Sequence, residues 1–240
     1  SSSSILETYL FLEWDLDEIF SRLVDQGCAL ISLVSIAAAI WTKKKFLFAF
    51  PAIHIFVVEI LSSSYGSSFY SELSFLTHSL RYVTPLLLFL YWLKFSSDDS
   101  DQLFRLLELT ISIVFITHGI KAISHDPSFI DFTIITIEVL THSPFSQSYA
   151  EIFLSTVGVI DILTGILVII ASHRISLFYM ASWGLMTAFV RLLCFPGYLG
   201  LGEFLVRTQH WVIPLVLLYY YYPQLYENKL FGDNFHEKSI

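Results

Sequence analysis

Eight ionisable side chains lie inside, or at the edges of, the long apolar stretches of this chain. A charged group in the hydrocarbon of a bilayer costs roughly 2.5–3.5 kcal/mol on insertion scales, so such residues are functional-site candidates by default. Acids, bases and histidines together could bind an anionic or quinone-like ligand and relay protons. The predicted ligand-binding residues are Glu59, His78, Arg81, His118, Asp161, Arg191, Arg207 and His210.

Charges of opposite sign at similar depth are expected to pair, because an unpaired charge in a low-dielectric interior is penalised heavily. The first pairing predicted joins Asp161 to Arg191 or Arg81, and the second joins Glu59 to Arg81 or Arg191. The polar groups are expected to cluster in the outer half of the membrane, with His54 as the deepest. Two interpretations stay open: a ligand-binding polar cavity open to the outside, or contacts that only fix helix packing.

The histidines also raise the possibility of metal or haem chemistry. His78, His118 and His210 fall at comparable depth, as axial haem ligands on facing helices must. The chain has no C-x-x-C-H or H-E-x-x-H motif, and a membrane histidine more often hydrogen-bonds across helices than binds metal. We therefore predict no metal site, regard haem as an unfavoured cofactor and assign no catalytic residue. Cys28 and Cys194 are interpreted as unpaired thiols, with a disulfide between them as the alternative.

The composition indicates a membrane protein. Of 240 residues, 55% are hydrophobic and 14% are charged, and the mean hydropathy is +0.67, whereas soluble domains carry about 25% charged residues. A water-soluble core could not bury this much apolar surface. The net charge of −8 argues against nucleic acid as a partner. The lipid bilayer is the first predicted partner.

Apolar runs of about 17–22 residues can cross a bilayer as helices. They predict an all-α, polytopic bundle of about seven transmembrane helices, with residues 1–23 as an N-terminal amphipathic segment on the membrane surface. Residues 129–140 are too short to span and predict an interfacial or partly re-entrant helix, with an eighth span as the alternative. The predicted spans are 24–41, 46–62, 74–94, 103–123, 151–171, 175–195 and 207–222.

Seven alternating helices place most basic loop residues on one side, which predicts an outside N-terminus and a cytoplasmic C-terminus. The domains expected are a first three-helix unit at 24–95, a four-helix unit at 103–222 and a cytoplasmic tail at 223–240. The two halves also show an internal similarity: RYVTPLLLFLY (81–91) is similar to HWVIPLVLLYY (210–220), and IAAAIWTKKKF (36–46) to ILVIIASHRIS (166–176). These matches predict two parallel copies of a three-helix unit.

Prolines and glycines predict where helices bend and approach. Pro85 and Pro214 each free a backbone carbonyl inside a predicted helix, four residues after Arg81 and His210. Kinks there would either open a pocket or only improve packing. Small residues that permit close helix approach are Gly119, Gly158, Gly165 and Gly184.

The second half resembles DoxX-like integral membrane proteins over residues about 103–222. The matching segments are LELTISIVFITHGIKAI (107–123), VGVIDILTGILVII (157–170), WGLMTAFVRLL (183–193) and RTQHWVIPLVLL (207–218). The residues that carry the resemblance are His118, Gly119, Lys121, Gly158, Asp161, Trp183, Ala188, Arg191, Arg207, His210, Trp211 and Pro214. Residues 1–95 depart from the four-helix pattern of that family.

The resemblance implies a four-helix core with polar residues near the outer face and an association with membrane redox systems. The function expected is that of an accessory subunit of a redox or envelope complex in the bacterial inner membrane, with a quinone or lipid in the outer-half cavity and protein partners in the membrane. The alternatives are a small-molecule transporter, a membrane oxidoreductase or an assembly scaffold. Whether the chain is an enzyme stays open.

Overall fold

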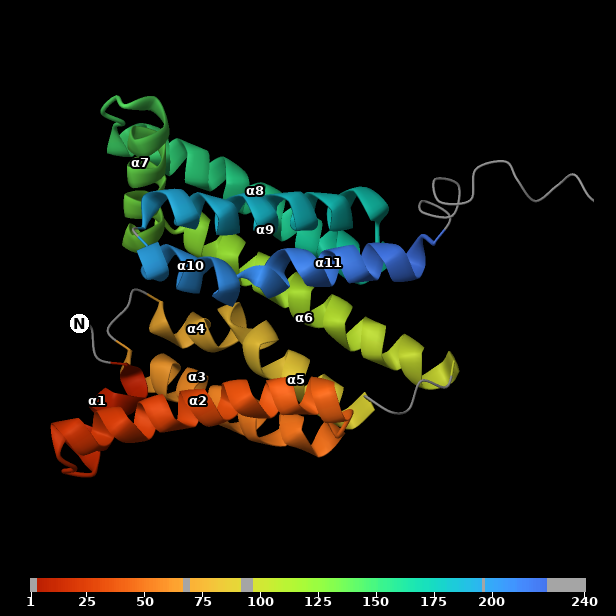
Figure 1. The fold of residues 1–240 in the computed structure, drawn as a ribbon. Helices are drawn as coiled ribbons and strands as arrows, with labels where there is room; N and C mark the ends of the chain where they lie inside the picture. Colours follow the sequence, from red (N-terminus) through yellow and green to blue (C-terminus); the bar gives the residue numbers. More distant parts are fainter. Residues whose placement is uncertain (1–3, 67–69, 92–96, 196, 224–240) are drawn as a thin grey trace, which may run out of the picture.

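The computed structural model describes residues 4–66, 70–91, 97–195 and 197–223, with the backbone alone for 97–100. Every regular element among these residues is helical, which confirms the all-α prediction (Figure 1). The elements are α1 (Ile5–Glu13), α2 (Glu18–Thr42), the short 3-10 helix η1 (Lys45–Phe48), α3 (Ala49–Tyr65), α4 (Ser71–Thr77), α5 (Ser79–Tyr91), α6 (Ser97–Ile123), α7 (Pro127–Thr141), α8 (Gln147–Ala171), α9 (Arg174–Cys194), α10 (Gly197–Val206) and α11 (Thr208–Tyr221).

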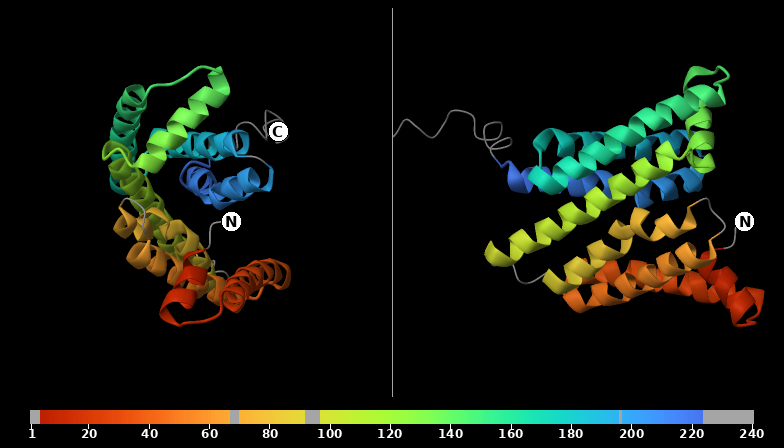
Figure 2. Two further views of the ribbon diagram at one scale, coloured as in Figure 1. Left: turned by 90° about the vertical axis from the view of Figure 1, so that its left-hand side faces the viewer. Right: turned by 180° about the vertical axis from the view of Figure 1, so that it is seen from behind.

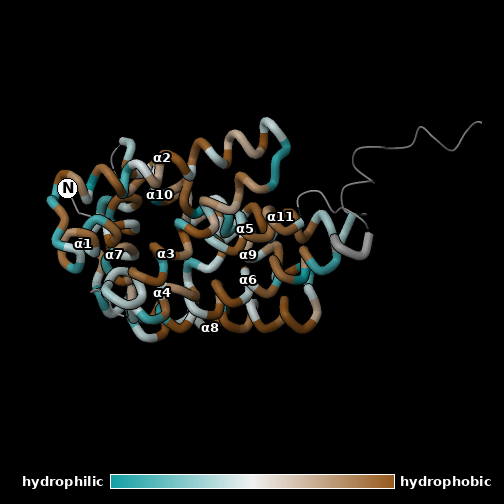
Figure 3. Tube along the Cα trace, turned by 90° about the horizontal axis from the view of Figure 1, so that it is seen from below, coloured by the Kyte–Doolittle hydropathy of each residue, from teal (hydrophilic) through white to brown (hydrophobic). Residues whose placement is uncertain are grey.

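Six helical segments of the described chain are long and apolar enough to cross a bilayer. Their outward faces are apolar as well: on α8, Leu163, Leu167 and Ile170 are exposed. Hydrophobic colour dominates the length of the spans in Figure 3, and hydrophilic colour gathers near their ends. An exterior of this kind suits lipid, so the chain is an integral membrane protein. The six segments are Glu18–Thr42, Lys45–Tyr65, Ser71–Tyr91, Asp101–Ile123, Gln147–Ala171 and Arg174–Cys194.

The seventh predicted span, 207–222, is not among these six segments, because its helix has only 14 residues. Its residues form α11, and α10 precedes it end to end (Figure 1), with Arg207 at the break between them. At this break the amide of His210 bonds the carbonyl of Arg207, three residues back, instead of following the α-helical spacing of four. The predicted tail lies outside the described residues from 224 onward.

The N-terminal boundary at 23 is also wrong, because α2 begins at Glu18. Asp17 caps this helix by accepting hydrogen bonds from the backbone amides of Ile19 and Phe20. The preceding helix α1 docks on the bundle through buried Glu7, whose Oε1 lies 3.2 Å from Nε of Arg22. Residues 18–23 therefore belong to the first span.

Helix bounds recur along the chain at a constant interval of 129 residues. The helices α2 and α8 both have 25 residues, and their first and last residues are 129 apart (147 − 18 and 171 − 42). The next spans, 45–65 and 174–194, both have 21 residues and the same interval (174 − 45 and 194 − 65). The interval places 36–46 opposite 165–175, one residue from the match seen in the sequence.

Local backbone features recur at the same interval. Left-handed residues follow α2 at Lys43 and α8 at Ser172. The third helix of each half is broken, at His78 and at Arg207, and a proline lies seven residues beyond each break. Two units of like architecture, α1–α5 and α7–α11, therefore make up most of the chain.

Helix α6 runs obliquely between these two units (Figures 1 and 2). Its side chains Ile111, Val114 and Phe115 are buried at the centre of the main apolar core, among residues from α5, α8, α9 and α11. The pair formed by α6 and α8 is the most extensive in the molecule. Gly119 and Gly158 allow it, because a Cβ on either would lie 2.6 Å from the backbone oxygen of the other.

Helix α7 lies across the ends of the neighbouring helices rather than along them (Figures 1 and 2). It has 15 residues, and left-handed residues flank it at His125 and His142. The orientation agrees with an interfacial helix over 129–140. We call this side of the bundle the α7 end.

Candidate functional site

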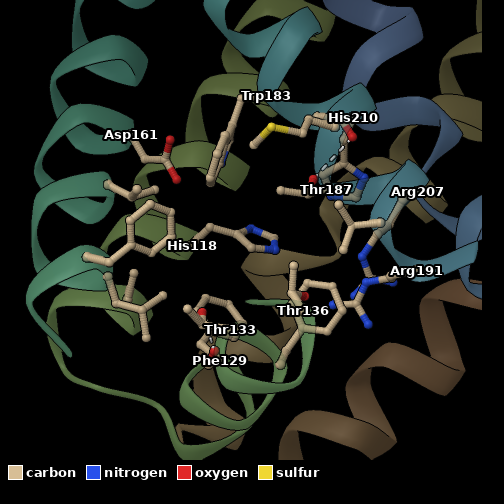
Figure 4. A pocket seen from close by; sticks show the side chains of 18 of the residues that line it. His118, Phe129, Thr133, Thr136, Asp161, Trp183, Thr187, Arg191, Arg207 and His210 are labelled. Atoms are coloured by element: carbon tan, nitrogen blue, oxygen red, sulfur yellow. Dashed lines mark hydrogen bonds between the residues drawn. The ribbon is translucent and has the colours of Figure 1, made fainter. Parts of the chain in front are cut away.

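A cavity of about 210 Å³ lies at the α7 end, between α6, α7, α8, α9 and the start of α11 (Figure 4). Its walls are largely apolar and include five aromatic side chains, and polar groups from separate helices face one another across it. The main apolar lining residues are Phe115, Phe129, Phe132, Phe153, Trp183 and Met186, and the threonines are Thr133, Thr136 and Thr187.

Five of the eight residues predicted from the sequence line this cavity. They come from α6, α8, α9, the break at Arg207 and the start of α11, so only the tertiary fold brings them together. These five are His118, Asp161, Arg191, Arg207 and His210. Glu59, His78 and Arg81 form a separate cluster in the first unit.

That cluster is a set of hydrogen bonds centred on buried Glu59. Nδ1 of His78 donates to Oε2 of Glu59 at 2.8 Å, and Nη1 of Arg81 donates to Oε1 at 3.0 Å. The predicted pair of Glu59 with Arg81 is therefore present. Glu59 belongs to α3, and its two donors lie at the break before α5 and in the first turn of that helix, so the cluster links α3 to this break.

The first predicted pairing is wrong. Asp161 accepts a hydrogen bond from the hydroxyl of Tyr179 at 2.7 Å, and among the described residues it has no ion pair with Arg191 or Arg81. Helices α8 and α9 are antiparallel with a short turn, which places residue 161 near residue 184 in depth. Arg191 lies about seven residues farther, or ~10 Å along the axis at ~1.5 Å per residue.

Arg191 and Arg207 instead share Glu203 on α10. Their Nη1 atoms lie 3.2 Å and 2.7 Å from the same oxygen, Oε2. The guanidinium of Arg191 also stacks on Phe132 of α7, 4.1 Å from the ring centroid. Sequence reasoning missed Glu203 because it predicted no helix over 197–206.

Two histidines, His118 and His210, line the cavity. Nδ1 of His118 lies 2.9 Å from the carbonyl oxygen of Val114, so this nitrogen is the donor and a neutral ring leaves Nε2 as an acceptor. The ring of His210 meets that of His118 edge to face, with centroids 5.6 Å apart. In the described chain, no three His, Cys, Asp or Glu side chains converge as a metal site requires.

The position of His210 depends on Gly184 of α9. A Cβ at Gly184 would lie 2.7 Å from the backbone oxygen of His210 and 2.9 Å from its carbonyl carbon. That carbonyl is the one released by Pro214, which has no amide hydrogen to donate. The glycine and the proline together let the start of α11 approach α9 and place the His210 ring in the cavity.

Helix α7 supplies a wall of the cavity that sequence reasoning did not foresee. It is anchored at its start by Asp126, whose Oδ2 lies 3.1 Å from Nζ of Lys121 and whose Oδ1 caps the helix at Ser128. Both charged groups are buried. A second tie is the 3.6 Å contact between Oγ1 of Thr136 and Sγ of Cys194. Cys194 and Cys28 are free thiols, so the disulfide alternative is wrong.

The opposite end of the bundle also holds a buried charge, although few polar groups were expected there. Glu108 of α6 is 1% exposed and accepts hydrogen bonds from Ser172 and from the hydroxyl of Tyr221, the latter at 2.9 Å. Nη1 of Arg105 lies 2.8 Å from its Oε2. The same rule that selected the other ionisable residues would have found Glu108, which lies within the predicted span 103–123.

Comparisons of the chain with protein-family models, with curated proteins and with solved structures find no match.

Proposed function

We propose that this protein is an accessory subunit of a membrane redox or envelope complex and holds an amphipathic, membrane-soluble ligand, a quinone or a lipid, in the cavity at the α7 end. One observation carries the proposal. The cavity combines aromatic walls with ionisable groups contributed by separate helices, in a protein whose exterior is apolar. Ligand sites are typically apolar cavities with a few convergent polar groups.

The polar groups form two poles. Asp161 lies across the cavity from Arg191, and the ring of His118 points into the space between them (Figure 4). The carboxylate and the Nε2 acceptor of His118 suit a hydroxyl group, whereas the guanidiniums of Arg191 and Arg207 suit a carbonyl or an anion. A ring or chain of a ligand would lie on the aromatic walls between the poles.

The proposed orientation follows from a seventh crossing made by α10 and α11 together. These two helices cover 197–221 and lie end to end (Figure 1), so their combined length suits a bilayer. Seven crossings and the basic loops put the N-terminus and the α7 end outside and the C-terminus in the cytoplasm. The DoxX-like resemblance supports a bacterial inner membrane and protein partners in a redox complex.

The test is to purify the protein from native membranes and identify what accompanies it by absorption spectroscopy and mass spectrometry. We expect a stoichiometric quinone or lipid, together with protein subunits of the complex. Thr187→Phe places a ring in the cavity and should remove the small molecule. The matched control Val159→Phe adds the same ring on α8 at an exposed position and should retain it. Recovery of only bulk lipid with the unmodified chain would overturn the proposal.

A transporter is the second candidate, favoured by the repeated architecture. Parallel repeats are common among transporters, whose substrate sites lie between or within the repeated units. Buried Glu108 adds a polar group on α6 at the end away from the cavity. Flux of a cavity ligand across proteoliposomes, lost in Glu108→Gln, would favour this function over that of a static subunit.

A further inference from the structure

The arginine side of the cavity has more positive charge than the carboxylate that it contacts neutralises. Arg191 and Arg207 both contact one oxygen of one carboxylate, Oε2 of Glu203. That carboxylate is 44% exposed, whereas the two guanidinium side chains are 15% and 22% exposed. Within the described chain neither arginine has another ion pair. The three groups together therefore carry a net charge of about +1 at neutral pH.

Within the described chain, the same side of the cavity has buried nitrogens without a partner, and one of them, Nε of Arg191, is a donor. Nε of Arg191 and Nδ1 of His210 are buried and have no hydrogen-bond partner among the described residues. A buried donor without an acceptor destabilises the site, because the desolvated N–H group is not compensated by a hydrogen bond. Both residues line the cavity. Surplus charge and the unpaired Nε donor of Arg191 thus coincide, and both are relieved by a group that brings several acceptor oxygens and a negative charge.

The opposite wall directs such a group to the arginines. Asp161 is the acidic residue on that wall, and its carboxylate accepts from Tyr179. Like charge repels an anion from Asp161. The ring of Phe132 stacks on the Arg191 guanidinium and offers apolar surface beside it, and Phe129 adds apolar surface elsewhere on the cavity wall. A cavity of about 210 Å³ exceeds the roughly 150 Å³ that holds benzene, so it holds a head group and a short length of chain.

We infer that the cavity ligand is an anionic amphiphile whose carboxylate or phosphate is held by Arg191 and Arg207. Arginine presents its donors in a planar fork that matches both groups. The apolar part of the ligand lies along Phe129 and Phe132. This inference rests on the proposed function and narrows it, because it prefers a fatty acid or a lipid phosphate over an uncharged quinone.

The test compares probes of equal chain length on the full-length protein in phosphatidylcholine nanodiscs. The probes are dodecanoate, dodecyl phosphate and dodecan-1-ol, with decylubiquinone as an uncharged quinone. We expect one anionic probe to bind in a 1:1 ratio at least tenfold more tightly than the alcohol. The tighter of the two anions distinguishes a fatty-acid carboxylate from a lipid phosphate as the natural head group.

The variants Arg191→Gln and Arg207→Gln should each weaken binding of the preferred anion at least tenfold. Arg174→Gln is the matched control, because Arg174 is exposed at the other end of the same helix as Arg191, and its binding should be unchanged. The probe comparison on the unmodified chain does not depend on the folding of any variant.

Three results would overturn the inference. If the alcohol binds as tightly as the anions, the cavity holds an amphiphile but does not select charge. If decylubiquinone alone binds, the cavity takes a quinone and the proposed function stands without the anion. If none of the four probes binds, the inference and the proposed function both fail.

Discussion

Replacing Gly158 by alanine tests the close contact between α6 and α8. The new Cβ would lie 2.6 Å from the backbone oxygen of Gly119 and 2.8 Å from Cγ1 of Ile123. Ordinary contacts of a Cβ begin near 3.4 Å, so the clash with the oxygen is about 0.8 Å (3.4 − 2.6). The oxygen belongs to helix backbone and can yield only if α6 and α8 move apart. Overpacking of this kind typically costs about 1–3 kcal/mol.

The matched control is Gly27→Ala in α2, where a Cβ would have no neighbour within 4 Å. Both changes gain the same helix propensity, about 1 kcal/mol, so their difference isolates the clash. We expect Gly158→Ala to be less stable than Gly27→Ala by about 1–3 kcal/mol in equilibrium unfolding in detergent. Gly119→Ala should behave like Gly158→Ala, because the contact is reciprocal. Equal stability of Gly158→Ala and Gly27→Ala, within about 0.5 kcal/mol, would refute the close packing of α6 and α8.

Three further predictions follow from other contacts. Asp161→Asn and Arg191→Gln should have effects on unfolding that add within about 0.5 kcal/mol, since the two residues share no partner; strong coupling in the double-mutant cycle would contradict this. Glu108→Leu should destabilise the fold by about 1–3 kcal/mol for each hydroxyl donor that it strands, and Glu108→Gln should lose less because it keeps an acceptor. In a chain whose Cys28 is replaced, Thr136→Cys should form a disulfide with Cys194 under mild oxidation, because Oγ1 of Thr136 lies 3.6 Å from Sγ of Cys194. If mass spectrometry finds both thiols still reactive, the position of α7 is refuted.

The helical membrane class followed from composition and run length alone. A chain with 55% hydrophobic residues and repeated apolar runs near 20 residues has few alternatives, because a lipid-exposed backbone must satisfy its hydrogen bonds within each helix. The repeat was also visible in the sequence, through Pro85 and Pro214. The sequence match aligned 36–46 with 166–176, one residue away from the alignment that the helix bounds give, because aliphatic residues match one another at many offsets. The turns at Lys43 and Ser172 set the register.

The sequence also pointed to residues that the fold brings together around one cavity. Ionisable groups are so unfavourable in hydrocarbon that composition and position mark them, and five of the predicted eight line one cavity. The ion pairs were harder to predict, because two residues at similar depth in the membrane need not be in contact. Glu59 and Arg81 meet, whereas the helical rise along α9 separates Asp161 from Arg191.

Sequence by itself thus determined that the helices cross a membrane, roughly where most of them lie, and that they carry buried polar groups. Only the tertiary structure decided which of those groups share a cavity. Helix α7 supplies one wall of the cavity, and Glu203 shares its carboxylate between two arginines. Both features depend on helix directions and on close backbone contacts such as that of Gly184 with His210. A hydropathy pattern indicates which segments of the chain lie in the membrane, but it does not specify which helices pack against each other.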